Sequence, residues 1–328
     1  MTTTDETLPL GLYEHLKSAS LMGRTIPEGA QWQEEILQKD DYNIPELLTQ
    51  FFATQLAPAL ESLKTPADQV ELINRMMELL PQDAEEQNDS LLTDDDSNVI
   101  QMRELALTDA KTTRPDIPLS DVALMTNTSK DLNLNTEIQK ELESADRVDL
   151  LCSFLKMSGV NSLSEQLKAI KNRGIPFRII TTTYMGATDR KAIDRLVEEY
   201  GAEVKISYQG DSTRLHAKAW LFHRNTGMST GYVGSSNLSS AALTDGLEWN
   251  VRISNPITPG LIRQFEGLFE SYWKSGDFTL YTASDQEKQE LDTALAKADI
   301  TGRKSKGLEY DIDSSLLDVH QIGRASCR

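Results

Sequence analysis

The chain has 328 residues, of which 39% are hydrophobic and 26% are charged, and this composition is typical of a soluble globular protein with two domains. No apolar run reaches the roughly 18 residues that a membrane-spanning helix needs, and the N-terminus lacks the basic and apolar regions of a signal peptide. The two cysteines, Cys152 and Cys327, are too few for a disulfide framework or a zinc site. We therefore expect a cytoplasmic protein without a membrane partner, a bound metal or another cofactor.

The net charge of −18 is unevenly distributed along the chain. Residues 1–113 hold 22 Asp and Glu against 7 Lys and Arg, whereas residues 114–328 hold 29 against 26. The acidity therefore belongs to the first third, and the remainder can present a locally basic face. The overall charge does not exclude a nucleic-acid partner.

The first third of the chain has helical periodicity. Apolar residues recur at helical spacing in Leu8–Ala19, Trp32–Leu37, Ile44–Leu63 and Val70–Leu80. The stretch Asp83–Asn98 is acidic and poor in large side chains, which indicates a solvated loop. We predict an acidic helical domain over residues 1–110, followed by an extended linker over 111–129, where prolines disfavour helix.

From about residue 130, helical and strand patterns alternate and predict an α/β domain with a mixed sheet over 130–276. The predicted helices are Leu134–Ser144, Leu163–Lys171, Ala187–Tyr200, Leu238–Leu243, Ile257–Trp273 and 284–299. The predicted strands are Val148–Phe154, Phe177–Thr182, Glu203–Tyr208, Leu215–Phe222, Thr230–Val233 and Leu247–Ile253, with a turn at Asn225–Gly227. Residues 277–328 are predicted to be a C-terminal helix and a polar tail. The ending Ile322–Arg328 is typical of vector read-through and is left out of the functional argument.

A histidine and a lysine form the first candidate site. His216 and Lys218 lie two residues apart on a predicted strand, so their side chains project from the same face. An imidazole is a suitable nucleophile for a phosphodiester, and a neighbouring ammonium neutralises phosphate oxygens. For this pair alone, the alternative is a partly buried strand with one structurally bonded histidine.

Two further features accompany this pair. The segment Gly234–Asn237 ends a predicted strand and opens a short helix, where backbone N–H groups, a hydroxyl and an amide can hold an oxyanion. Glu248 follows eleven residues after Asn237, and a carboxylate there can fix the tautomer of a histidine. Taken singly, the segment also fits a helix cap, and Glu248 also fits a solvated strand residue.

Together these residues resemble the phospholipase D superfamily, whose signature is His-x-Lys, four residues, Asp, six residues, and Gly-Ser-x-Asn. The residues that carry the resemblance are His216, Lys218, Gly234, Ser235 and Asn237, with Glu248 where the nuclease branch has its glutamate. The alternating pattern of residues 130–275 is similar to that fold as well. The resemblance implies a phospholipase-D-like mixed sheet flanked by helices, preceded by a smaller all-helical domain.

The amino-acid sequences around the motifs are similar to those of one subgroup, the nuclease modules that precede superfamily-two helicases in bacteria. The stretches concerned begin at Arg214 (Arg-Leu-His-Ala-Lys-Ala-Trp), Tyr232 (Tyr-Val-Gly-Ser-Ser-Asn-Leu-Ser) and Gly246 (Gly-Leu-Glu-Trp-Asn-Val). This likeness implies that the chain is the N-terminal module of a longer protein with a downstream helicase domain.

The sequence departs from the signature at two places. The motif aspartate is expected seven residues after His216, where this chain has His223. The Gly-Ser pair arrives four residues late, and a longer hairpin tip would absorb that difference. In this family the aspartate is a supporting residue, so its replacement weakens the expectation of activity without refuting it.

The resemblance implies a metal-independent hydrolysis of phosphodiesters through a phosphohistidine. In that scheme His216 attacks phosphorus, Lys218 and Asn237 neutralise the phosphate oxygens, Ser235 helps to hold them, and Glu248 orients His216. Arg214, Gly234 and Ser236 are the further candidates for substrate binding.

The same scheme needs a second histidine, and the chain has one His-x-Lys copy. His223 lies at an odd offset from His216 on the predicted strand, so we expect it to face away. A two-fold homodimer through the active-site face would bring two His216 side chains together.

DNA is the expected substrate. Basic residues gather in Lys171–Arg178, at Arg190-Lys191 and at Arg214, where they can follow a nucleic-acid backbone or simply solvate helix ends. Trp220 and Phe222 share the predicted face of His216 and serve either base stacking or, more commonly, core packing. Two other functions remain open: a non-catalytic nucleic-acid-binding or regulatory module of the helicase, and a phosphotransferase or phospholipase on a small substrate.

Overall fold

The computed structural model describes residues 7–8, 16–31, 44–79, 92, 112–127, 132–208, 215–244 and 248–306. The chain divides into two compact units, residues 1–105 and 106–328. Several predicted features lie outside the described residues: the helix Trp32–Leu37, most of the helix Leu8–Ala19, nearly all of the acidic stretch Asp83–Asn98, and the tail from residue 307.

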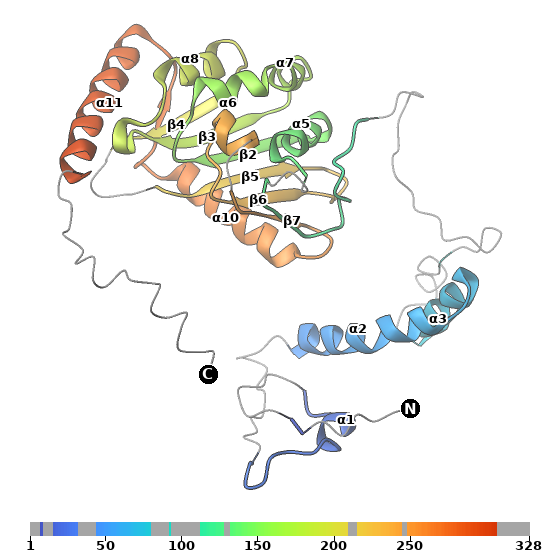
Figure 1. Ribbon diagram of the computed structural model, residues 1–328. Coiled ribbons are helices and arrows are strands. Elements are labelled where there is room, and N and C mark those ends of the chain that lie inside the picture. Colours follow the sequence, from blue (N-terminus) through green and yellow to red (C-terminus); the bar gives the residue numbers. More distant parts are fainter. Residues whose placement is uncertain are drawn as a thin grey trace. The chain divides into compact units, whose positions relative to one another are not determined.

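The described part of the first unit is helical, as predicted (Figure 1). Its helices are α1 (Ala19–Met22), α2 (Ile44–Ser62) and α3 (Pro66–Glu78). The hydroxyl of Thr65 caps α3 by accepting a hydrogen bond from the N–H of Asp68 at 3.2 Å. Pro66 occupies the first helical position, where a missing N–H costs no hydrogen bond. The apolar side chains Leu48 and Phe52 of α2 are exposed.

The second unit is built on one eight-stranded mixed sheet with the order β1-β7-β6-β5-β2-β3-β4-β8. The strands are β1 (Ala123–Met125), β2 (Arg147–Cys152), β3 (Phe177–Thr182), β4 (Glu203–Ser207), β5 (Lys218–His223), β6 (Thr230–Gly234), β7 (Asn250–Ser254) and β8 (Thr279–Tyr281). Strands β2, β3 and β4 are parallel, and the other neighbours pair in antiparallel fashion. The predicted α/β class with a mixed sheet is confirmed.

Helices cover both faces of this sheet (Figure 1). The helices are α5 (Leu134–Ser144), α6 (Met157–Ser162), α7 (Ser164–Asn172), α8 (Arg190–Glu198), α9 (Ser240–Thr244), α10 (Pro259–Lys274) and α11 (Asp285–Lys306), with a 3₁₀ turn η1 at Tyr184–Gly186. Buried side chains of α5, α7 and α8 share one core with Trp220 and Phe222 of β5. On the opposite face, Ile262 of α10 packs against Leu221.

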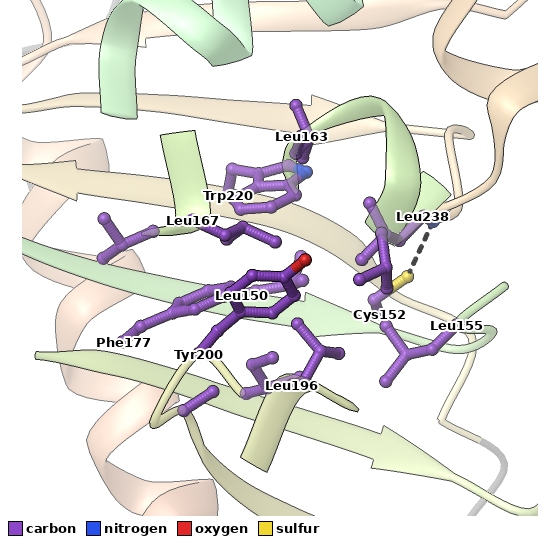
Figure 2. Packing of buried hydrophobic residues seen from close by; sticks show 14 of the residues in the cluster. Leu150, Cys152, Leu155, Leu163, Leu167, Phe177, Leu196, Tyr200, Trp220 and Leu238 are labelled. Atoms are coloured by element: carbon purple, nitrogen blue, oxygen red, sulfur yellow. Dashed lines mark hydrogen bonds between the residues drawn. The ribbon is translucent and has the colours of Figure 1, made fainter. Parts of the chain in front are cut away.

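Aromatic stacking fixes the centre of the larger core (Figure 2). The ring of Trp220 stacks on Phe177 with centroids 6.1 Å apart, and on Phe222 with centroids 5.7 Å apart. Trp220 and Phe222 are almost fully buried. Their use is therefore core packing, and the alternative of base stacking is excluded for both.

The structure corrects the predicted linker over residues 111–129. Residues 123–125 form the edge strand β1, in which Leu124 lies opposite Val251 of β7. The preceding segment is also attached to the domain, because Ile117 is buried and the carboxylate of Glu137 accepts the N–H groups of Asp116 and Ile117. Prolines indicated extended backbone correctly, but this extended segment lies on the sheet.

A buried ionic network holds α5 to the hairpin β5–β6 and to β7. The carboxylate of Glu141 accepts bonds from the guanidinium groups of Arg224 at 2.5 Å and Arg252 at 3.2 Å. It also accepts the hydroxyl groups of Thr230 at 2.8 Å and Tyr232 at 2.9 Å. Because all these side chains are buried, each charge depends on its partners for stabilisation.

Candidate active site

The register of the strands brings the candidate residues to one edge of the sheet. Cys152, the last residue of β2, pairs with Lys218, the first residue of β5. Gly234, the last residue of β6, pairs with Asn250, the first residue of β7. Alternating strand directions therefore place the end of β2, the start of β5, the end of β6 and the start of β7 side by side.

His216 and Lys218 are in direct contact at this edge. Nζ of Lys218 lies 2.9 Å from Nδ1 and 3.1 Å from Nε2 of His216, and it donates to the His216 carbonyl oxygen at 2.7 Å. His216 is exposed, whereas Lys218 is buried. Burial lowers the pKa of Lys218, and the nearby Cys152 and Glu248 oppose this shift. Partial desolvation therefore disfavours the charged form of this ammonium, which lies beside an accessible imidazole.

Residues 234–240, here called the cradle loop, follow β6. A Cβ on Gly234 would lie 2.1 Å from the carbonyl oxygen of Trp249, so only glycine fits this position. Ser235 is exposed; its N–H donates to the Trp249 carbonyl at 3.1 Å, and its hydroxyl accepts the Trp249 N–H at 3.1 Å. The Ser235 hydroxyl also donates a long bond of 3.5 Å to the Trp249 carbonyl, and a phosphate oxygen can replace this acceptor.

Asn237 is oriented by the end of β2. Its Oδ1 accepts the backbone N–H of Phe154 at 3.1 Å. Because a backbone N–H can only donate, the oxygen of this amide must face Phe154. The NH₂ group then faces away from that bond, and the described residues offer it no acceptor. Asn237 is thus set to donate to an anion.

Ser236, one of the further candidates for substrate binding, directs its side chain into the protein. Ser236 is buried; its hydroxyl donates to the carbonyl of Ala242 at 3.3 Å and accepts Nδ2 of Asn250 at 2.8 Å. Both bonds fix the cradle loop to α9 and β7 from inside the protein. The other expected binding residue, Arg214, lies outside the described residues.

Glu248 contributes its charge to the site without touching the histidine. Its carboxylate raises the pKa of Lys218. Where the chain is described, Glu248 forms neither a hydrogen bond nor an ion pair with His216. Glu248 thus acts on the charge of the lysine, whereas the resemblance implies a partnership with the histidine.

His223, which stands in place of the motif aspartate, faces the opposite side of the sheet, as expected. Its Nε2 lies 2.7 Å from Oδ2 of Asp149, and its Nδ1 lies 3.1 Å from Oε1 of Glu266 on α10. Burial raises the pKa of Asp149, but hydrogen bonds from His223 and Arg178 outweigh it, so the pKa lies below its usual value. His223 therefore joins β5 to β2 and α10 and does not contact His216.

Sequence reasoning missed two residues of the site. Phe154 holds Asn237 through its N–H, and its ring meets His216 edge to face with centroids 6.5 Å apart. The buried thiol of Cys152 accepts the N–H of Leu238 at 3.2 Å (Figure 2). These contacts join residues more than 60 positions apart, so no local sequence pattern predicts them.

The described residues contain neither a metal-binding cluster nor a membrane-spanning helix. Within those ranges, no group of three or more His, Cys, Asp or Glu side chains is arranged to bind a metal ion. No described helix is both long and apolar enough to cross a membrane.

One family of known proteins matches part of the second unit. Residues 138–273 match the family described as "Cardiolipin synthase, PLD-like domain". This part of the chain is similar to a phospholipase-D-like domain. The matched range includes His216, Lys218, Ser235, Asn237 and Glu248. No curated protein gives a significant match to the chain.

Several solved structures also match part of the chain at low identity. The phospholipase D family member Nuc from Salmonella typhimurium is 19% identical, with 50% of this chain and 99% of Nuc covered and a TM-score of 0.39. NucT from Helicobacter pylori is 12% identical over 49% of this chain and 99% of NucT, with a TM-score of 0.39. The phosphatidylserine synthase from Haemophilus influenzae is 14% identical over 55% of this chain and 46% of the synthase, with a TM-score of 0.39.

Proposed function

We propose that the chain hydrolyses phosphodiester bonds in DNA without a metal ion, through a phosphohistidine formed on His216. The observation that carries this proposal is the contact between the exposed imidazole of His216 and the buried ammonium of Lys218. Nearby, Ser235 and Asn237 offer a hydroxyl and an amide that can bind the same phosphate. This set supplies a nucleophile and at least three donors of positive charge or hydrogen.

The reaction proceeds in two displacements at phosphorus. One ring nitrogen of His216 forms a bond to phosphorus while the bond to the leaving oxygen breaks, and a second histidine donates a proton to that oxygen. The second histidine then takes a proton from water, whose oxygen attacks phosphorus and releases His216. Lys218 and Asn237 stabilise the charge on the phosphate oxygens in both steps.

We propose that the second histidine is His216 of another copy of the chain. The other described histidine, His223, is bonded to Asp149 and Glu266 on the far face of the sheet. An apolar strip on that far face reaches the strand ends that carry the cradle loop: Leu124 and Val233 lie opposite Val251, and all three are about half exposed. Trp249, which bonds to Ser235, extends the strip and is 68% exposed. An isologous contact along the end of this strip would bring together the strand ends that carry the two sites.

DNA as the substrate and a helicase as the partner are parts of the same proposal. The basic residues of the second unit and the nearly balanced charge of residues 114–328 support a polyanionic substrate. The amino-acid sequence around His216 and Glu248 supports association with a superfamily-two helicase. We propose that the two act together in the cytoplasm. Co-purification of the chain with such a helicase tests that association.

Cleavage of labelled single- and double-stranded DNA in EDTA tests the proposed activity. We expect the wild type to cleave and His216→Ala to lose cleavage while it retains a wild-type melting temperature. Cleavage that survives in His216→Ala refutes the assignment of the nucleophile. DNA binding without cleavage by either protein favours the alternative of a non-catalytic binding module. The replacement of the motif aspartate by His223 would then account for the lack of cleavage.

A further inference from the structure

The cradle loop rests on one short segment at the end of β2. Residues 152–159, here called the support segment, run from the last residue of β2 into α6. Five hydrogen bonds join the two. The thiol of Cys152 accepts the N–H of Leu238 and approaches Oδ1 of Asn237 as a donor at 3.7 Å. The N–H of Phe154 donates to the same Oδ1. The other two bonds run from the Lys156 N–H to the Leu238 carbonyl at 2.8 Å and from the Ser240 N–H to the Ser158 hydroxyl at 3.2 Å.

A glycine in the support segment allows the two backbones to touch. A Cβ on Gly159 would lie 2.5 Å from the carbonyl carbon of Leu238, 2.6 Å from its oxygen and 2.7 Å from the nitrogen of Ser239. All three atoms belong to the backbone of the cradle loop, so no rotamer change relieves the contact. Any other residue at position 159 has to push the loop away from α6.

Cys152 completes the support as a neutral hydrogen-bonding group. Burial raises the pKa of its thiol to about 11, so the S–H persists at neutral pH. The thiol donates to the carbonyl of Phe154 at 3.1 Å and accepts the N–H of Leu238. It thereby links Phe154, whose N–H holds Asn237, to Leu238, the residue after Asn237. Its position opposite Lys218 in the sheet links this tie to the ammonium.

We infer that the support segment positions the amide of Asn237 for phosphate binding, with Gly159 and Cys152 as positioning residues. This inference rests on the proposed function of the site. Neither residue contacts the reacting atoms; each acts by fixing where Asn237 lies relative to Lys218. A displacement of about 1 Å in such a group lowers the rate by about 100-fold.

A double-mutant cycle on phosphate binding tests the inference. The probe is inorganic phosphate, and its affinity for the full chain is measured by calorimetry. We expect Gly159→Ala and Asn237→Ala each to weaken binding by about tenfold. We expect the double variant to be no weaker than Asn237→Ala, because Gly159 acts through Asn237. Gly267→Ala is the matched control, since a Cβ on this glycine of α10 meets no atom within 4 Å.

Cys152 variants keep the test independent of folding defects in Gly159→Ala. A positioning role predicts that Cys152→Ala weakens phosphate binding and that Cys152→Ser, which keeps a donor and an acceptor, restores most of it. Additive losses in the cycle, wild-type affinity in Gly159→Ala, or equal losses in the serine and alanine variants overturn the inference. A wild type that does not bind phosphate overturns it too.

The same samples separate this inference from the proposed function. If Gly159→Ala and Asn237→Ala show coupled losses of phosphate binding but the protein never cleaves DNA, the positioning role of the support segment is supported and the proposed nuclease activity is refuted. Cleavage that depends on His216 but is unchanged in Gly159→Ala supports the nuclease and refutes the positioning role.

Discussion

Nζ of Lys218 lies within 3.1 Å of both ring nitrogens of His216 and also donates to the carbonyl oxygen of His216. A single ammonium therefore holds the backbone and approaches the ring of the residue that we propose as the nucleophile. Because Lys218 is buried and His216 is exposed, a phosphate that reaches the imidazole also reaches a positive charge that water does not fully screen.

Removal of this ammonium is expected to abolish most of the activity. Lys218→Met keeps the length of the side chain and removes its charge, so kcat/KM for DNA cleavage should fall about 100-fold or more. Lys274→Met is the matched control, because the Lys274 side chain on α10 is 78% exposed. A Lys218→Met protein with wild-type kcat/KM would remove Lys218 from the mechanism.

The pH dependence of phosphate binding should report the burial of Lys218. Because burial lowers its pKa, its charge and the affinity for phosphate should be lost at a lower pH than for an ordinary lysine, whose pKa is about 10.4. Glu248 opposes the shift, so Glu248→Gln should move the alkaline limb to still lower pH. Calorimetric titrations across the alkaline range measure this limb, and an unmoved limb in Glu248→Gln contradicts the coupling.

The buried network around Glu141 should dominate the stability of the second unit. Glu141→Gln removes the negative charge that compensates Arg224 and Arg252, both buried, so the free energy of unfolding should fall by about 3–5 kcal/mol. Glu165→Gln, on an 80% exposed side chain of α7, should change it by less than about 1 kcal/mol. Urea unfolding followed by fluorescence gives both values, and equal effects would contradict the account.

Restoration of the family aspartate should harm this protein. His223→Asp places a carboxylate against Asp149 and Glu266, so we expect a loss of about 2–4 kcal/mol in unfolding free energy and no gain in cleavage. Asp149 stabilises the fold above its unfolded pKa of about 3.9, and this contribution is lost as pH falls through its lower folded pKa. Without His223 that folded pKa rises, so acid unfolding should begin at higher pH. His223→Gln should show a smaller loss of stability.

The apolar strip should control both assembly and activity. Val251→Lys places a charge in the centre of the strip, so a dimer seen by analytical ultracentrifugation should become a monomer and lose cleavage together. Leu280→Lys is the control, because Leu280 is exposed on β8, the edge strand at the opposite end of the sheet from β1. A wild type that sediments as a monomer and still cleaves DNA contradicts the shared site.

The sheet and most of its helices were predictable because their signals are local. Helical spacing predicts the helix Leu134–Ser144, which matches α5. A short apolar run predicts the strand Phe177–Thr182, which matches β3. The turn at Asn225–Gly227 predicts the hairpin β5–β6, and Gly227 has the left-handed φ of +80° that such a turn requires. Strand β1, with three residues, is too short to show an alternation.

The candidate site was predictable only as a set of residue types. The spacing from His216 to Asn237 identifies the groups that can act on a phosphate, but their support comes from Cys152, Phe154 and Gly159, which a pattern of the chain does not connect to Asn237. The inward hydroxyl of Ser236 shows the reverse error, since a serine in a motif need not face the substrate.

The most direct test of the central claim is the detection of a covalent bond between His216 and DNA. Internally radiolabelled single-stranded DNA is mixed with the protein in EDTA, quenched in denaturant and resolved on a gel. We expect a labelled protein band that is stable in base, labile in acid and absent in His216→Ala, with His223→Gln still labelled. Cleavage by the wild type without any trapped band, or a band that persists in His216→Ala, would contradict it.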